Sequence, residues 1–236
     1  MISILKKLLS SKYKRSIKER LGVPSLHWSL QNLKKLGYNP GFVMDIGAYE
    51  GCWTRDFLEV FPSAKVLMVE AQKSKEKKIE RVCSVFPSAS YHIASLSGED
   101  GKELYFRENE TASHVTSFRE SHSIAIKSES VDAILQRKGL PFPDFLKLDV
   151  QGYELEVLRG AALALKHAEF CLLEVSMLEL FNEPLFAEVV AFMNVQGFQA
   201  YDISQLMRRP FDSALYQVDL LFIKKDSSFV SIKRWN

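Results

Sequence analysis

The sequence predicts a doubly wound α/β domain built on a mostly parallel sheet. From residue 41 onward, short apolar runs alternate with stretches of helical periodicity, which is the pattern of repeated βα units. The first of these runs, Phe42–Ile46, ends at a glycine that leads into a helical stretch. The last two runs have no helical stretch between them, so an antiparallel strand is expected at the C-terminal end of the sheet.

Strands are expected where short apolar runs are bounded by turn residues or charges. In order along the chain they lie at 42–46, 65–69, 90–94, 102–106, 124–131, 145–150, 169–175, 199–203 and 218–223. The strand at 102–106 follows a turn at 97–101 and is typical of a hairpin. Residues 107–123 are polar and aperiodic, so a mobile loop is expected there.

Helices are expected between these strands, where apolar residues recur at helical spacing. They lie at 52–61, 74–85, 132–139, in a short stretch ending at Leu158, and at 184–196. Pro62 ends the first helix, because proline cannot continue it. Gly139 and Gly197 end two later helices, and Ser74 is the expected N-cap of the second.

The composition is that of an ordinary globular chain. Of the 236 residues, 47% are hydrophobic and 25% are charged, which is enough for one sizeable core. A net charge of +2 is too small to indicate nucleic-acid binding, and no apolar run is long enough to span a bilayer. The three cysteines contain no C-x-x-C pair, so neither a disulfide framework nor a zinc site is expected, and the expected setting is the cytoplasm.

Positive charge is concentrated at the N-terminus. Seven lysines and arginines stand against one glutamate in residues 1–22. Apolar residues recur there at helical spacing: Ile2, Leu5, Leu8 and Leu9. The segment therefore predicts a basic amphipathic helix, which either packs on the domain or makes weak contact with an anionic membrane surface; its interrupting lysines exclude a signal peptide. The chain divides into a basic helical extension, a main domain and a tail, at 1–40, 41–226 and 227–236.

The loop after the first strand has the glycine spacing of a cofactor site. In Asp45–Gly51, two glycines four positions apart allow a ligand to approach the backbone. A dinucleotide fingerprint needs G-x-G-x-x-G, whereas Tyr49 stands at its middle glycine. Glu70, 23 residues after Gly47, follows the second strand, where a carboxylate can bind a ribose diol. This combination favours an adenosyl cofactor without a pyrophosphate.

The stretch Leu146–Glu154 places charges inside a strand that should be buried on both faces. Burying an unpaired charge is costly, so Lys147 and Asp149 are expected to have a partner or a function. Asp149 lies at the carboxyl end of the strand, where α/β folds bind ligands. A purely structural pair of Lys147 with Asp149 or Glu154 is the alternative explanation.

These two stretches resemble the FkbM family of S-adenosylmethionine-dependent methyltransferases. The family pattern D-I/V-G-A-N-x-G-x-x-T is similar to Asp45–Thr54, and L-K-I/L-D-V/I-E/Q-G-x-E is similar to Leu146–Glu154. Shorter matches follow at Val157–Ala161, Glu174 and Gly197–Phe198. The resemblance covers residues 41–224, and Tyr49 stands where the family has asparagine.

The resemblance implies a class I methyltransferase fold, a bound S-adenosylmethionine, and O-methylation of a hydroxyl on a sugar, a glycan or a natural product. It puts Asp45, Gly47 and Gly51 at the methionine part of the cofactor and Glu70 at the ribose. Ala94 and Ser95 are put at the adenine edge. The other expected cofactor-binding residues adjoin these positions: Ala48, Tyr49, Thr54 and Ala71.

A base is needed to accept the hydroxyl proton as the oxygen attacks the methyl carbon. The candidates are Asp149, Glu174 and His114; histidine titrates near neutrality, although a lone loop histidine is also explained as an ordinary exposed side chain. Alternatively, Asp149 and Glu174 hold a divalent cation that orients two substrate oxygens, but two carboxylates are too few to require one, so no obligatory metal is expected.

Two other functions are considered for the chain. A nicotinamide dehydrogenase is disfavoured because the middle glycine is missing. A non-catalytic interaction module on the same fold, with an altered cofactor loop, is the main alternative to the enzyme. For the enzyme, a small molecule or a glycan is the expected acceptor, and no nucleic acid is expected.

Overall fold

The computed structural model describes residues 21–110, 113–116, 118–119, 121–181, 183–231, 233 and 235. The basic amphipathic helix expected at the N-terminus lies almost entirely outside these residues. None of the described helices is long and apolar enough to cross a membrane. All three cysteines are described, and each is a free thiol.

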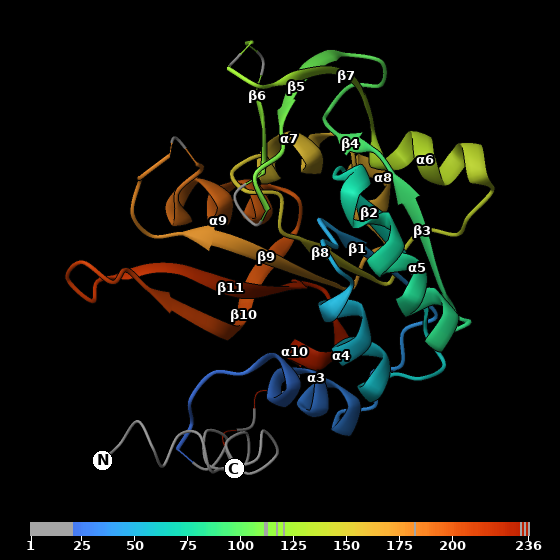
Figure 1. Ribbon diagram of the computed structural model, residues 1–236. Coiled ribbons are helices and arrows are strands. Elements are labelled where there is room, and N and C mark those ends of the chain that lie inside the picture. The colour runs from blue at the N-terminus through green and yellow to red at the C-terminus, as the bar shows by residue number, and fades with distance from the viewer. Residues whose placement is uncertain are drawn as a thin grey trace, which may run out of the picture.

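Within the described residues, the main sheet has seven strands, in the order β10-β11-β9-β8-β1-β2-β3 (Figure 1). Their bounds are β1 Phe42–Ile46, β2 Lys65–Glu70, β3 Ala89–Ile93, β8 Phe145–Leu148, β9 Phe170–Ser176, β10 Phe198–Arg208 and β11 Leu215–Lys224. Neighbouring strands from β3 to β9 are parallel, whereas β11 is antiparallel to both β9 and β10. The predicted doubly wound, mostly parallel sheet with an antiparallel C-terminal strand is therefore confirmed.

The sheet reverses its direction of growth between β1 and β8. The chain runs outward from β1 through β2 to β3 on one side, and from β8 through β9 to the final hairpin on the other. In open α/β sheets, ligands bind outside the carboxyl ends of the strands at such a switch point. The expected site residues after β1 and β8 therefore meet at the place that the topology favours for a ligand.

Helices cover both faces of the main sheet. One face carries α3 Leu26–Lys35, α4 Cys52–Val60, α5 Glu76–Val85 and α10 Ser228–Ser231, and the other carries α6 Val131–Lys138, α7 Glu154–Arg159, α8 Ala162–His167 and α9 Phe186–Val195. A short 3-10 helix, η1 Lys73–Lys75, precedes α5. The packing of α3 joins part of the predicted extension to the main sheet, because Ser29 donates a hydrogen bond of 2.6 Å to Asp202.

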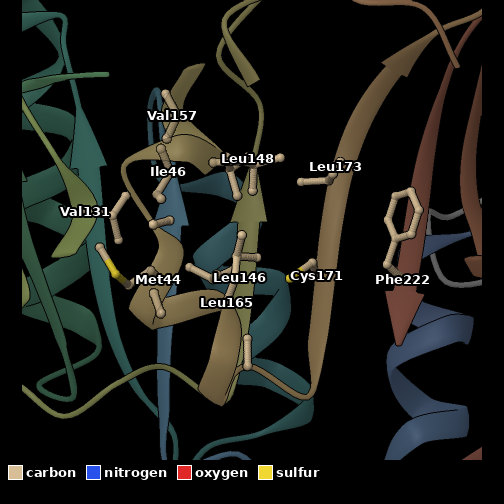
Figure 2. Close-up of a cluster of buried hydrophobic side chains, with 14 of the residues drawn as sticks. Met44, Ile46, Val131, Leu146, Leu148, Val157, Leu165, Cys171, Leu173 and Phe222 are labelled. Carbon is tan, nitrogen blue, oxygen red and sulfur yellow. The ribbon is translucent and has the colours of Figure 1, made fainter. Parts of the chain in front are cut away.

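Each face of the sheet has its own apolar cluster, because side chains alternate along a strand. In β1, Met44 and Ile46 point into the cluster beneath α6 to α9, and Val43 points into the cluster beneath α3 to α5. Figure 2 shows the first cluster, with Leu146 and Leu148 of β8 between the side chains of β1 and β9. These strands are buried on both faces, so a charged residue within them must find a partner inside the protein.

A second, smaller sheet borders the carboxyl ends of the main strands. Its order is β4-β7-β5-β6, with bounds Ser95–Leu96, Ile124–Glu129, Glu103–Arg107 and His114–Thr116. The predicted mobile loop at 107–123 was wrong in part, because β6 lies within it. Its backbone pairs with β5, from Tyr105 opposite Thr116 to Arg107 opposite His114. A strand of three residues is too short to show a periodicity, so only its tertiary partner defines it.

Several predicted boundaries were also wrong. The strand expected to reach Val150 ends at Leu148, because the chain turns through left-handed backbone at Gln151 and Gly152. Ser74 does not cap α5: it lies within η1, and its hydroxyl donates to Glu108. The strand expected to reach residue 131 ends at residue 129, because Ser130 instead caps α6.

The sequence prediction missed α8. No residue at its own start caps this helix; instead, the carboxylate of Asp132 accepts hydrogen bonds from the Leu163 and Ala164 amides at 2.7 and 3.0 Å. Asp132 is 31 residues away from Leu163, so a local capping signal is absent from the sequence around α8.

We predict that Asp132→Ala lowers the free energy of unfolding by about 1 kcal/mol, because two amides at the start of α8 lose their acceptor. Urea unfolding measures the change. Asp132→Asn keeps one acceptor oxygen and serves as the matched control, with a smaller expected loss. An alanine variant as stable as the parent protein would show that this remote cap contributes nothing.

Candidate functional site

Two neighbouring cavities lie at the carboxyl ends of β1 and β8. The first, of about 180 Å³, is bordered by the ends of β1, β2 and β3 and by the small sheet. The second, of about 290 Å³, lies between the start of α4, the ends of β8 and β9, and residues within β10 and β11. Gly47, Tyr49 and Asp149 line both cavities, so a ligand in one would lie beside a ligand in the other.

The two glycines of the loop are required by the protein's own packing. Gly47 has φ +73°, and a Cβ there would lie 1.8 Å from the backbone oxygen of Asp149. Gly51 has φ +74°, and its Cβ would lie 2.9 Å from the Val82 side chain. Glycine at 47 thus lets the segment after β8 approach the segment after β1, and glycine at 51 lets the loop lie against α5.

Asp45 lies beneath this loop and lines neither cavity. Its side chain is fully buried; Oδ2 accepts a 2.6 Å hydrogen bond from the Thr54 hydroxyl, and Oδ1 lies 3.1 Å from the Lys147 ammonium. Asp45 and Lys147 are register partners on neighbouring strands, so their side chains point to the same face of the sheet. This placement favours a positioning role for Asp45 and Thr54 over direct contact with a ligand.

Lys147 joins the ends of the two central strands. Its ammonium donates to the Gly47 carbonyl at 2.8 Å and to the Ile46 carbonyl at 3.3 Å, and it lies 3.8 Å from Asp149 Oδ2. Burial works to lower the pKa of Lys147, but Asp45 and Asp149 outweigh burial, so the pKa is raised and the ammonium stays charged. The closest carboxylate is Asp45 rather than either predicted partner, Asp149 or Glu154.

Glu154 stabilises the turn that follows β8. Its Oε1 accepts hydrogen bonds from the Val150 and Gly152 amides, at 3.1 and 3.2 Å, and so holds the turn after β8. Burial raises the pKa of this carboxyl to about 7. The turn that carries Asp149 and Gln151 into the cavities is therefore braced from the start of α7.

Glu70 lies at the first cavity, at the end of β2, and is almost fully buried. Its Oε2 accepts a hydrogen bond from the Tyr49 amide at 2.6 Å, and Oε1 accepts one from the Gln72 amide at 2.7 Å. Burial raises its pKa, and these backbone hydrogen bonds work against that rise. Each oxygen can accept a further hydrogen bond, so the carboxyl group can still bind a ligand hydroxyl.

The rest of the first cavity is mainly apolar. The expected residues Ala71, Ala94 and Ser95 line it, together with residues that the sequence analysis missed: Val69, Gln72, Leu96, Phe106 and Val157. The side chain of Gln72 is buried, and its Oε1 has no hydrogen-bond partner within the described residues. An unpaired acceptor beside an apolar slot fits a flat, hydrogen-bonding ring such as adenine.

Carboxyl groups gather at the second cavity. Gln151 Nε2 donates to Asp149 Oδ1 at 2.9 Å and to Glu174 Oε2 at 3.0 Å, so the two predicted catalytic carboxyls lie together. Burial, with Asp149 and Asp219 adding repulsion, raises the pKa of Glu174 to about 9. Burial and Asp149 raise the pKa of Asp219 to about 6.

The other predicted site residues are distributed as follows. His114, on β6, lines the first cavity, whereas Glu174 lines the second. Ala48 lines the second cavity, and Gly51 lines neither. Among the described residues, no group of three or more His, Cys, Asp or Glu side chains is arranged to hold a metal ion.

The chain is similar to known methyltransferases. A family model described as the methyltransferase FkbM domain matches residues 45–200. Hexuronic acid methyltransferase AglP of Haloferax volcanii is 40% identical over 53 residues, which is 22% of each chain. The crystal structure of methyltransferase FkbM from Methylobacillus flagellatus KT matches with a TM-score of 0.50 and 16% identity, over 78% of this chain and 43% of that chain. At this identity the structural match shows the fold alone, and the fold is that of class I methyltransferases.

We predict that Lys147→Met lowers the free energy of unfolding by about 3–5 kcal/mol, because the Asp45 carboxylate then stays buried without its cation. Chemical denaturation measures the loss. The double variant Lys147→Met with Asp45→Asn removes both charges and is expected to recover much of it. If the free energy of unfolding of Lys147→Met is not lower than that of the double variant, Lys147 and Asp45 do not stabilise each other.

Proposed function

The chain belongs to the FkbM family of S-adenosylmethionine-dependent methyltransferases, and we propose that it methylates a hydroxyl oxygen of a sugar, a glycan or another natural product. The observation that supports this most strongly is the junction of two cavities at Gly47, Tyr49 and Asp149. A transferase needs two adjacent ligands, with the reacting atoms where their sites meet. The hexuronic acid in the name of the curated relative is consistent with a sugar acceptor.

The residues of the first cavity fit an adenosyl group. Glu70 would bind the ribose hydroxyls, and the slot between Val69, Leu96 and Phe106 would hold the adenine ring. When bound, S-adenosylmethionine supplies an electrophilic methyl group on a sulfonium. Gly47 and Asp149, at the junction, would flank the part of the cofactor that faces the second cavity.

The second cavity is the proposed acceptor site. Trp53 provides an aromatic wall, and its ring stacks on Phe57 with centroids 4.8 Å apart, so its position is fixed. Most of the charged groups around the cavity are carboxyls, and the Lys147 ammonium is already paired with Asp45. The carboxyls beside Asp149 disfavour a carboxylate as the methylated group, so a neutral hydroxyl is the better acceptor atom at this point.

Asp149 is the proposed base. Burial and the repulsion of Asp149 and Asp219 raise the pKa of Glu174 above that of a free carboxyl, which favours its protonated form. A protonated carboxyl donates a hydrogen bond rather than accepting a proton. Asp149 lines both cavities, and its side chain is 39% exposed. It can therefore accept the proton of a hydroxyl in the second cavity and pass it to solvent.

We predict that the protein binds S-adenosylmethionine, with saturable heat in isothermal titration and a raised melting temperature. Ligand at about one hundred times its Kd stabilises the folded state by about 2.7 kcal/mol. Glu70→Gln, which keeps the size of the side chain, is expected to weaken binding about tenfold or more. Absence of heat and of any thermal shift at millimolar ligand would refute the enzyme and favour the interaction module.

We predict that Asp149→Asn lowers kcat by about 10²–10⁴-fold, because a proposed general base is lost, while the affinity for S-adenosylmethionine changes little. Transfer of a labelled methyl group to a panel of hydroxylated sugars measures the effect. Glu174→Gln is the matched control and is expected to lose less than about tenfold, since glutamine resembles a protonated carboxyl. A larger loss in Glu174→Gln than in Asp149→Asn would reverse the two roles.

A further inference from the structure

Three side chains meet at the edge of the first cavity, one of them from the loop after β1. Tyr49 of the glycine loop donates a 2.5 Å hydrogen bond to Glu110, which follows β5. Lys75 of η1 forms an ion pair with the same Glu110 carboxylate. The Lys75 ammonium also lies 3.3 Å from the Tyr49 hydroxyl and 4.5 Å from the centroid of its ring. We call Tyr49, Lys75 and Glu110 the clasp.

The clasp joins segments that are far apart along the chain but border one cavity. Tyr49 and Glu110 both line the first cavity, and so does Gln72. The side-chain nitrogen Nε2 of Gln72 donates a 3.0 Å hydrogen bond to the backbone carbonyl of Glu110. Two residues before Glu110, the Glu108 side chain accepts a hydrogen bond from the Ser74 hydroxyl. The stretch Glu108–Glu110 is therefore tied to the end of β2 and to η1 from several directions.

The backbone of Tyr49 and Glu110 and the burial of Lys75 indicate that the clasp is held by its mutual contacts. Tyr49 and Glu110 both have left-handed backbone, with φ +51° and +47°, which is unfavourable for residues other than glycine. The side chain of Lys75 is only 7% exposed, so its ammonium depends on these partners, and on Glu50 at 3.9 Å, in place of water. Glu110 is largely exposed, which leaves the contact free to open on the solvent side.

We propose that the clasp closes the outer wall of the first cavity over the adenosyl group, and that Tyr49 is a positioning residue that slows release of the cofactor. The proposal rests on the proposed function, because it takes this cavity as the cofactor site. It also assigns a role to the tyrosine that replaces the asparagine of the family pattern. In the closed clasp, Nε2 of the Gln72 side chain is bound to the Glu110 carbonyl. Its unpaired Oε1 is then left to accept a hydrogen bond from the cofactor.

The test compares variants that keep the aromatic ring. Tyr49→Phe removes only the hydroxyl that binds Glu110, and stopped-flow displacement of bound S-adenosylmethionine measures its release. We expect release about three- to tenfold faster than in the parent protein, as for the loss of one partly exposed charged hydrogen bond. Hydrogen exchange in residues 103–110 is also expected to be faster, both with and without the cofactor.

Tyr105→Phe is the matched control. Tyr105 lies on β5, and its hydroxyl donates to exposed Glu103 without lining either cavity. Its release rate and exchange are expected to match those of the parent protein. If Tyr49→Phe also matches the parent in release and exchange while the parent binds the cofactor, the clasp proposal alone fails. If the parent itself binds no S-adenosylmethionine, the proposed function fails and the clasp proposal fails with it.

Discussion

The ion pair between Lys147 and Asp45 lies under the point where the sheet changes direction, and both cavities are built above it. Lys147 also donates to the Gly47 carbonyl at 2.8 Å, while the Asp149 amide donates to the Ile46 carbonyl at 3.1 Å. These contacts bring the segments after β1 and β8 so close that only glycine fits at position 47. The residues shared by the two cavities are therefore fixed relative to one another by a buried charge pair.

The carboxyl groups beside this pair differ in their surroundings. Lys147 lies nearest to Asp45, and the remaining acids at the second cavity repel one another in a partly buried setting. Burial and this repulsion raise the pKa of Glu174, whereas the side chain of Asp149 is 39% exposed and lies where both cavities meet. Two carboxyls that lie close together are thus buried to different extents.

Local patterns in the sequence predicted a large part of this arrangement. The sheet followed from alternating apolar and helical stretches, and Glu70 was placed at the cavity because an acid at a strand end is a local signal. The role of Gly47 was not predictable in the same way: the atom that requires glycine belongs to Asp149, on another strand. Asp45 was expected at the cofactor, and its pairing with Lys147 depends on the strand register, which the sequence does not display.

Contacts between remote segments account for the other differences. The partners of Tyr49 in the clasp lie 26 and 61 residues away, so the sequence showed only that an asparagine had been replaced. The helix α8 is capped from α6, and β6 exists only because β5 pairs with it. In each case, the hydrogen bonds that define the feature join segments far apart in the sequence. A short stretch of sequence therefore does not show them, and tertiary context outweighs local propensity.

We infer that the Lys147–Asp45 pair fixes a cofactor site at the switch point between β1 and β8. A crystal structure with S-adenosylhomocysteine is the sharpest test. We expect the ribose hydroxyls to bind Glu70, the adenine to lie near Ala94 and Phe106, and the sulfur to face Asp149, with Lys147 still bound to Asp45. A Lys147 side chain turned away from Asp45 to bind the ligand, or an adenosine outside the first cavity, would rule this arrangement out.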